Sequence, residues 1–197
     1  MKVTKEQMAR NRARILDEAG RLFRERGFAA VSVAEVMKAA GLTHGGFYGH
    51  FRSKDDLIAQ VIANASGYGE SKVDDLCAFI DQYLSTAHRD RADAGCPTAA
   101  FAGLMRDQAP EARAALARKL GGQIDRFAAG MPGNTPDERR RAAIGSFSAM
   151  VGALVLARAI DDPALSGELL NQTRAWIADD TPPDRHTPDQ TRRAAYS

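Results

Sequence analysis

Apolar residues recur at helical spacing along most of the chain. Five of them form one stripe along an otherwise charged N-terminal segment, the pattern of an amphipathic helix: Ile15, Leu16, Ala19, Leu22 and Phe23. Gly27 follows this stripe, and glycine readily adopts the left-handed conformation that ends many helices. The pattern therefore predicts a first helix that ends at Gly27.

A second, shorter helix is indicated by a local capping pattern. Ser32 is followed three residues later by Glu35, the spacing of a capping box in which each side chain bonds to the other residue's backbone amide. A helix is therefore expected over residues 33–40, with Gly41 stopping it.

Two more helices are expected close behind this turn. Thr43 is a suitable N-cap for a third helix, and Phe47 and Phe51 lie four residues apart on one face of it. Ser53 precedes two carboxylates, which favour the positive end of a helix, so a fourth helix is expected to begin there.

Longer helices are predicted beyond residue 60, beginning with residues 73–86 and followed by a polar connector at 88–95. Four later helices are expected to start close to prolines: Pro97, Pro110, Pro136 and Pro163. Residues 181–197 contain three prolines and little apolar content, which predicts a disordered tail. No convincing strand pattern is found, so the chain is expected to be all-α.

Composition agrees with a soluble globular protein. The chain has 197 residues, of which 44% are hydrophobic and 26% charged, and its two cysteines are too few for a disulfide scaffold. The charged N-terminus lacks the apolar stretch of a signal peptide, and no membrane-spanning run is evident. A cytoplasmic protein without a membrane partner is the expectation.

Charge is distributed unevenly along the chain. Residues 1–60 hold 11 Lys and Arg against 7 Asp and Glu, whereas the remainder has a slight acidic excess. A basic end on a near-neutral body suggests a polyanionic partner there. A solvated, charged first helix would explain the charge equally well, so a motif is needed to decide.

The motif is a helix-turn-helix. Two short helices joined by a tight turn at Gly41 occupy residues 33–51, an arrangement in which the first helix is held by packing and the second lies in the DNA major groove. Phe47 and Phe51 would face inward with residues of the preceding helix. The outward positions would then be Thr43, His44, Gly45, Tyr48 and Gly49.

The same residues resemble a known family. The segment GLTHGGFYGHFRSK at 41–54 is similar to the DNA-binding signature of the tetracycline-repressor (TetR) family of bacterial transcriptional regulators. The resemblance covers about residues 10–60 and continues back through Ala19, Leu22, Phe23, Gly27 and Phe28. It implies a DNA-binding domain at 1–52 and a larger helical effector-binding and dimerisation domain at 53–180, with the tail at 181–197.

The resemblance also implies which residues contact DNA. Four polar groups match positions that the family uses to hold phosphate oxygens: Thr43, Tyr48, His50 and Lys54. His44 is the best candidate for reading base edges, and Ser32 and Gly45 complete the expected contact set. Gly46 and Gly49 stand where the family often has larger side chains, so close backbone approach or shape readout is favoured.

The C-terminal two-thirds is expected to supply a dimer interface and an effector site. A helix-turn-helix usually binds palindromic half-sites as a dimer, so a homodimer formed by the last two helices is predicted through Phe147, Val151, Leu154 and Trp176. Each of these could instead be intrachain core. An apolar effector pocket is predicted, with plain core as the alternative, from Tyr68, Phe79, Tyr83, Phe101, Met105 and Phe127.

Other function classes find less support. Nucleotide-binding, zinc-protease and nucleophile-elbow motifs are not found, and the four histidines are scattered, so neither an enzyme nor a metal or cofactor site is expected. A helical interaction protein that does not bind DNA remains an alternative. Cys96 precedes Pro97, so it could be a reactive thiol at a helix N-terminus or a small buried residue.

Overall fold

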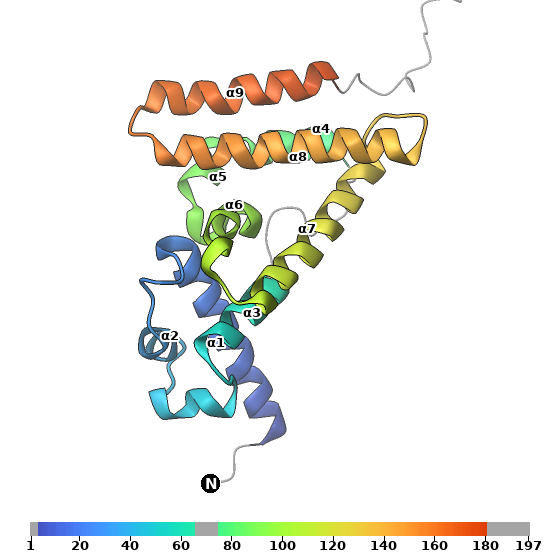
Figure 1. Cartoon of the computed structure of the whole chain (residues 1–197). Coiled ribbons are helices and arrows are strands. Elements are labelled where there is room, and N and C mark those ends of the chain that lie inside the picture. Colours follow the sequence, from blue (N-terminus) through green and yellow to red (C-terminus); the bar gives the residue numbers. More distant parts are fainter. Residues whose placement is uncertain (1–3, 66–74, 181–197) are drawn as a thin grey trace, which may run out of the picture.

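The computed structural model describes residues 4–65 and 75–180, and all regular elements of those two stretches are helical (Figure 1). The first four elements are α1 (Lys5–Arg26), α2 (Val33–Ala39), the 3-10 helix η1 (His44–Gly49) and α3 (Lys54–Asn64). The middle of the chain holds α4 (Leu76–Tyr83), α5 (Thr86–Asp90), η2 (Ala92–Ala94), α6 (Pro97–Phe101) and η3 (Ala102–Asp107). Three long helices complete it: α7 (Pro110–Gly130), α8 (Pro136–Ala159) and α9 (Pro163–Asp180). The all-α prediction is confirmed.

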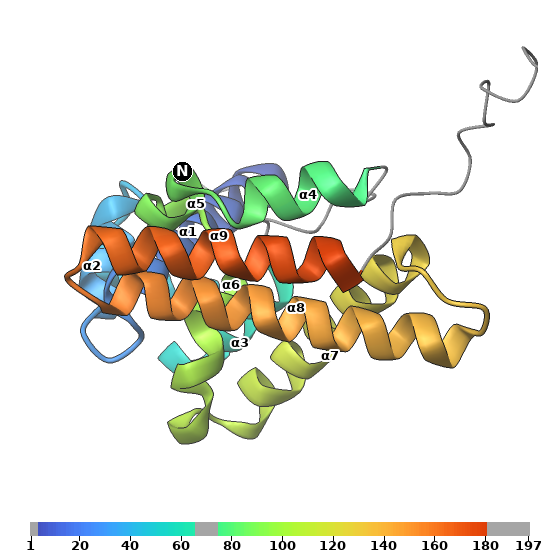
Figure 2. The same cartoon turned by 90° about the horizontal axis from the view of Figure 1, so that it is seen from above.

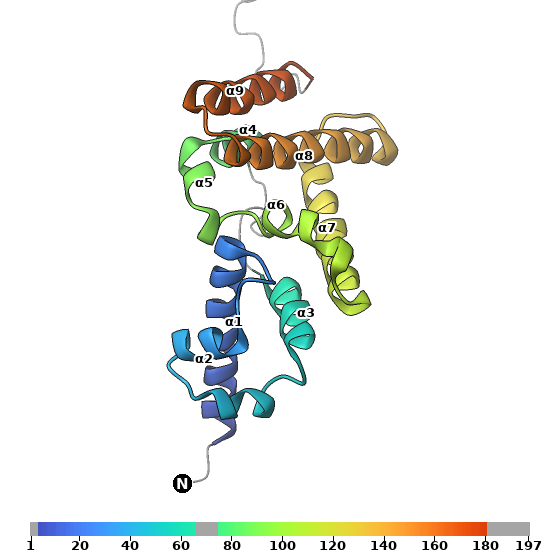
Figure 3. The ribbon, with the colours of Figure 1, turned by 60° about the vertical axis from the view of Figure 1, so that its left-hand side comes forward.

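The helices are arranged as two ends joined by a long diagonal helix. α1, α2, η1 and α3 make one end of the molecule, and α8 and α9 lie side by side at the other, while α7 runs obliquely between them (Figures 1 and 3). The helix-turn-helix segment therefore lies at the end opposite α8 and α9.

Local capping explains where the first helices begin. The Thr4 side chain accepts from the Gln7 amide at 3.1 Å, and the Ser53 side chain accepts from the Asp56 amide at 3.0 Å. At α2 the predicted capping box is confirmed, because Ser32 Oγ accepts from the Glu35 amide and the Glu35 carboxylate accepts from the Ser32 amide.

Glycine ends α1 and shapes the turn after α2, as predicted. Gly27 has a φ of 76° and Gly41 a φ of 66°, values that side-chain-bearing residues rarely adopt. A Cβ at Gly41 would also lie 2.8 Å from the Arg14 guanidinium, which donates to the Ala40 carbonyl. Gly41 is thus favoured by its backbone conformation, and a side chain there would also displace the end of the flexible Arg14 side chain.

The third helix differs from its prediction. It is a 3-10 helix of six residues, and Thr43 precedes it without a side-chain cap. Three of its six residues are glycines, each of which costs about 1 kcal/mol relative to alanine in an α-helix. Low intrinsic helicity therefore yields the shorter, tighter form, which its neighbours must hold in place.

The segment around residue 85 also differs from its prediction. The expected helix over 73–86 is α4, which begins at Leu76 and ends at Tyr83, and part of the expected polar connector forms α5. Ser85 caps α5 by accepting from the His88 amide.

The buried His88 ring connects α4 to the start of α6. It bonds to the Tyr83 carbonyl at 2.7 Å and accepts from the Cys96 amide at 3.0 Å. Burial lowers the pKa of His88 to about 4, so this bridge is neutral at physiological pH.

Two hydrophobic clusters hold the molecule together. The first joins α1, α2, η1 and α3 to Phe101, Met105 and the start of α7, and the second joins α4 to α8 and α9. Because α3 packs between α1 and α7, the proposed division at residue 52 separates segments that share a core. That division stays a prediction.

α8 is long and apolar enough to cross a membrane by length and composition alone. In this fold it packs between α7 and α9 and buries seven of its residues, as the core helix of a soluble protein also would.

Cys96 is fully buried at the start of α6, which fits the core alternative for this residue. The tail predicted at 181–197 lies outside the described residues.

Candidate nucleic-acid interface

η1 is held on its inner side by two phenylalanines. Phe47 and Phe51 are 1% and 2% exposed, and their rings stack with centroids 5.6 Å apart. The Arg12 guanidinium of α1 lies over the Phe51 ring, 5.0 Å from its centroid. The predicted inward direction of both rings is confirmed, and it fixes which side of η1 meets solvent.

The outer side of η1 carries the predicted contact residues. Thr43, His44, Gly45 and Tyr48 are all exposed, and Tyr48 is the most exposed large apolar side chain described, at 71%. Its ring meets the buried Phe47 ring edge-on at 5.3 Å, so Tyr48 stands on a fixed support. All four residues are therefore open to solvent within one short segment.

The remaining predicted contact residues differ in how exposed they are and in whether their polar groups are already hydrogen-bonded. Ser32 is exposed, but its hydroxyl also donates to the Glu35 carboxylate at 2.8 Å. His50 and Lys54 are half-buried. At the start of α3 the amides of Asp56 and Arg52 are already bonded to Ser53 and to the Asp56 carboxylate. Lys54 is the first residue of α3 and contributes an ammonium group at that end of the helix.

The three glycines of η1 are not required by the fold. None has a positive φ, and a Cβ at Gly45 would meet nothing within 4 Å. At Gly46 and Gly49 the nearest atoms would be methionine methyl groups at 3.7 and 3.9 Å, which is ordinary contact. The protein itself has room for side chains here, so their absence leaves a smooth outer surface.

The basic first half of α1 lies beside η1. Besides Arg12 over Phe51, the Met8 methyl group approaches Gly49, which places the N-terminal turns of α1 next to the C-terminal end of η1. The exposed cations Lys5 and Arg10 belong to the same turns. The charge asymmetry seen in the sequence is thus located at the same end as the motif.

One exposed cation was missed by the sequence reasoning. Arg52 lies between η1 and α3, its side chain is 89% exposed, and it approaches the Asp56 carboxylate only to 3.7 Å. Its position directly after Phe51 was the available signal, because the residue that follows an inward-facing anchor often faces outward.

Protonation states at this surface follow from local charges. Partial burial and the nearby Arg12 lower the pKa of His50, so the ring is neutral at physiological pH. At the start of α2, hydrogen bonds from Ser32 and the Arg26 guanidinium lower the pKa of Glu35 to about 2. The capping box therefore stays ionised and intact across the physiological range.

The residues predicted for an apolar effector pocket are divided between the two clusters. Phe101 and Met105 belong to the first cluster, whereas Tyr83 and Phe127 belong to the second, where Phe79 packs against both rings. Tyr68 lies outside the described residues. The two groups do not come together within the described residues, so the shared pocket stays a prediction.

The residues predicted for a dimer interface are also divided. Phe147 and Leu154 are 4% and 0% exposed and point into the chain's own core, so they are not presented to a partner. Val151 is half-buried and Trp176 is 54% exposed. One face of α8 packs into the core of its own chain, and another face is exposed. Because α8 is apolar on nearly all sides, its sequence pattern does not show which residues belong to which face.

Comparison with known proteins places the motif in a family. Residues 15–61 match the family model described as bacterial regulatory proteins, tetR family. The HTH-type transcriptional regulator AcrR of Shigella flexneri is 37% identical over 83 residues, which span 42% of this chain and 39% of AcrR. An uncharacterized HTH-type transcriptional regulator of Mycobacterium tuberculosis is 28% identical over 169 residues, 75% of this chain and 84% of that protein. The chain spans at most about half the length of the first curated relatives it matches.

Solved structures share the arrangement of helices over most of the chain. A TetR transcriptional regulator from Legionella pneumophila superposes with a TM-score of 0.67 at 22% identity, covering 86% of this chain and 96% of that one. E. coli NemR in its reduced form superposes with a TM-score of 0.64 at 19% identity, covering 89% and 100%. At this level of identity the likeness concerns the arrangement of helices.

Proposed function

Because this chain belongs to the tetR family of bacterial regulatory proteins, we propose that it is a DNA-binding transcriptional regulator. One observation carries the proposal. η1 is braced from inside by Phe47 and Phe51 and presents an exposed, glycine-rich surface at the basic end of the molecule. A braced short helix with a smooth outer side is suited to lie in a major groove.

The exposed residues divide by chemistry into two roles. Thr43, Tyr48, Lys54 and Ser32 offer hydroxyl and ammonium groups that hold phosphate oxygens, and the neutral His50 adds a hydrogen bond without charge. His44 and the backbone at Gly45 face the base edges. This assignment leaves direct base readout to very few groups, so the shape of the duplex contributes to recognition.

Regulation is proposed to follow the pattern typical of the family. The protein acts in the cytoplasm as a homodimer, represses transcription from a palindromic operator, and releases the operator when a small-molecule effector binds. Release requires that the effector bind more tightly to the conformation that fits DNA poorly. No catalytic step is part of this account.

Selection from random duplexes tests the proposal. Purified full-length protein is incubated with randomised double-stranded DNA, and bound sequences are recovered and compared. We expect a palindromic consensus whose half-sites lie about one helical turn apart, or a multiple of it. Recovery of no enriched sequence, together with binding that does not weaken as salt increases, would contradict DNA recognition and favour a helical protein-interaction module.

The dimer proposal is supported by an apolar face outside the core. Figure 2 shows α8 and α9 side by side, and Figure 1 shows them at the end of the molecule opposite α1 and α2. Five large apolar side chains of these helices are between 42% and 54% exposed: Ile144, Val155, Leu156, Leu165 and Trp176. Leu165 and Trp176 are eleven residues apart, so they share one side of α9. Large apolar side chains left exposed on two neighbouring helices are typical of an interface when they form a continuous patch.

Replacing Leu156 with arginine tests this face. The substitution places a charge within the proposed interface, so we expect the protein to change from dimer to monomer in sedimentation equilibrium and to lose affinity for the palindrome. Leu104→Arg is a matched control, because Leu104 is also an exposed leucine (39%) but lies on η3. A Leu156→Arg protein that remains dimeric, or a control that dissociates equally, would contradict the assignment.

A further inference from the structure

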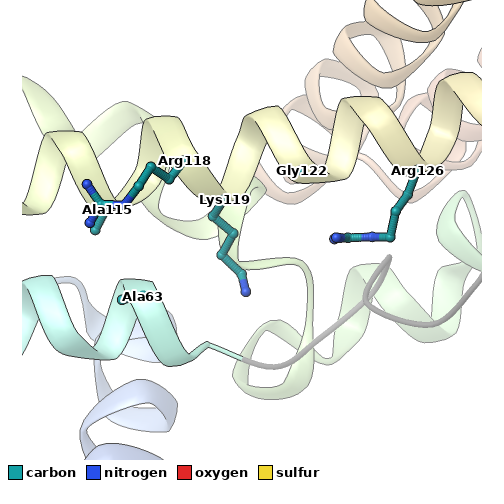
Figure 4. Close-up of a pocket in the computed structure, with 6 residues that line it drawn as sticks. All are labelled: Ala63, Ala115, Arg118, Lys119, Gly122 and Arg126. Carbon is teal, nitrogen blue, oxygen red and sulfur yellow. The ribbon is translucent and has the colours of Figure 1, made fainter.

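A basic pocket lies between α3 and α7. It has a volume of about 410 Å³ and is lined by one residue of α3 and five of α7: Ala63, Ala115, Arg118, Lys119, Gly122 and Arg126 (Figure 4). Half of these residues are cationic and the other half are alanine or glycine. The pocket thus combines positive charge with open space.

The spacing of these residues explains the shape of the pocket. Positions 115, 119, 122 and 126 repeat at four- and three-residue intervals, so they share one side of α7, and Arg118 flanks them. Arg118 and Arg126 are eight residues apart, about 12 Å along the helix axis. The cationic residues are therefore spread along about two turns of α7.

The small residues leave room that the cations can use. A Cβ at Gly122 would lie 3.4 Å from Nη1 of Arg126, so the guanidinium extends over the glycine. Figure 4 shows the Lys119 and Arg126 side chains leaving α7 on the same side. Both are half-buried and also interact within the chain, so a bound anion would join or exchange those interactions.

The pocket is joined to the proposed DNA-binding surface through α3. Ala63 lies near the C-terminal end of α3, and the N-terminal end of the same helix carries Lys54 and follows η1 by four residues. Leu57, Ile58 and Val61 of α3 pack in the same cluster as Ala112, Ala115 and Leu116 of α7. A molecule that changes the spacing of α3 and α7 would therefore also move the start of α3.

We propose that this pocket binds the effector and that the effector is a small organic anion, of the carboxylate, sulfonate or phosphate ester class. The inference rests on the proposed function, because it identifies the chemistry of the molecule that releases the operator. Guanidinium groups bind such oxygens in pairs, and charge-assisted hydrogen bonds are about twice as strong as neutral ones. The site differs in character from the apolar pocket that the sequence predicted.

A matched pair of fluorescent probes tests the charge preference. 1-Anilinonaphthalene-8-sulfonate is the anionic probe, and N-phenyl-1-naphthylamine has the same aromatic body without the sulfonate. We expect the full-length protein to bind the sulfonate saturably, and the Arg118→Gln/Arg126→Gln double variant to bind it at least about tenfold more weakly, an effect of ~1.4 kcal/mol. Binding of the neutral probe should be the same in both proteins.

Arg113→Gln is the control variant, because Arg113 is exposed on α7 and does not line the pocket. Unchanged sulfonate binding in the double variant, or equal weakening in the Arg113→Gln protein, would overturn the proposal. A double variant that binds duplex DNA more weakly with no probe present would overturn it too, because the cations would then contact DNA. Circular dichroism verifies that all variants are folded.

Measurements of operator affinity with and without the probe distinguish a failure of the effector assignment from a failure of the proposed function. The anionic probe should lower the affinity of the wild-type protein for the selected duplex and leave that of the double variant unchanged. Strong duplex binding that the probe does not alter would refute the effector assignment and leave DNA recognition intact. Failure to bind any duplex would refute the proposed function, while the titrations without DNA would still report on the pocket.

Discussion

Replacing Gly45 with leucine should abolish operator binding without unfolding the protein. Gly45 is exposed, has an ordinary backbone conformation, and a Cβ there would meet no protein atom within 4 Å. The fold therefore tolerates the side chain, and the loss of a helical glycine stabilises by up to ~1 kcal/mol. On the DNA side, a leucine would keep the backbone of η1 from approaching the base edges.

Fluorescence anisotropy with the selected duplex and urea unfolding measure the two effects separately. We expect the affinity of the Gly45→Leu protein to fall about a hundredfold or more, within the range of a few kcal/mol that poor base contacts cost. Gly103→Leu is the matched control, because Gly103 is also an exposed glycine of a six-residue 3-10 helix with nothing within 4 Å. If both variants bind as the wild type does, η1 does not approach the duplex closely.

Replacing Phe47 with alanine should, unlike the Gly45 substitution, lower the stability of the protein. The whole N-terminal end should be destabilised. Phe47 is 1% exposed and contacts the rings of both Phe51 and Tyr48. Truncation of a buried phenylalanine costs about 3–5 kcal/mol, a large part of the ~5–15 kcal/mol that stabilises a typical domain. We expect a reduced free energy of unfolding in urea, with DNA binding lost as a consequence.

Tyr48→Ala is the informative companion variant. Tyr48 is the neighbouring aromatic residue but is 71% exposed, so its removal should cost at most ~1 kcal/mol of stability while weakening binding to all duplexes. A Phe47→Ala protein as stable as the wild type would show that the inner packing does not hold η1. A Tyr48→Ala protein that binds with full affinity would remove Tyr48 from the contact set.

Local signals predicted the N-terminal end of the fold well. The capping box of Ser32 and Glu35, the stop at Gly41 and the helix start at Ser53 each depend on residues close in sequence, so the pattern contains the necessary information. The inward direction of Phe47 and Phe51 follows from the same short-range spacing. These features are sufficient to locate the exposed side of η1 from the sequence.

Features that depend on long-range packing could not be predicted in the same way. α8 is apolar on nearly all sides, so its sequence does not reveal that Phe147 and Leu154 face the core while Leu156 faces solvent. The pocket between α3 and α7 combines residues more than fifty positions apart in the sequence, such as Ala63 and Ala115. The sequence around Arg118, Lys119 and Arg126 is typical of the solvated face of a long helix. It does not show that α3 packs beside these residues and forms a pocket with them.

Site-specific crosslinking can show whether the outer side of η1 lies against a duplex. p-Benzoylphenylalanine is introduced in place of Tyr48 in one protein and in place of Trp176 in another, and each is irradiated with the selected duplex. We expect a protein–DNA crosslink from position 48 and a crosslink between two chains from position 176. A DNA crosslink from position 176, with none from position 48 while the duplex is bound, would contradict this expectation.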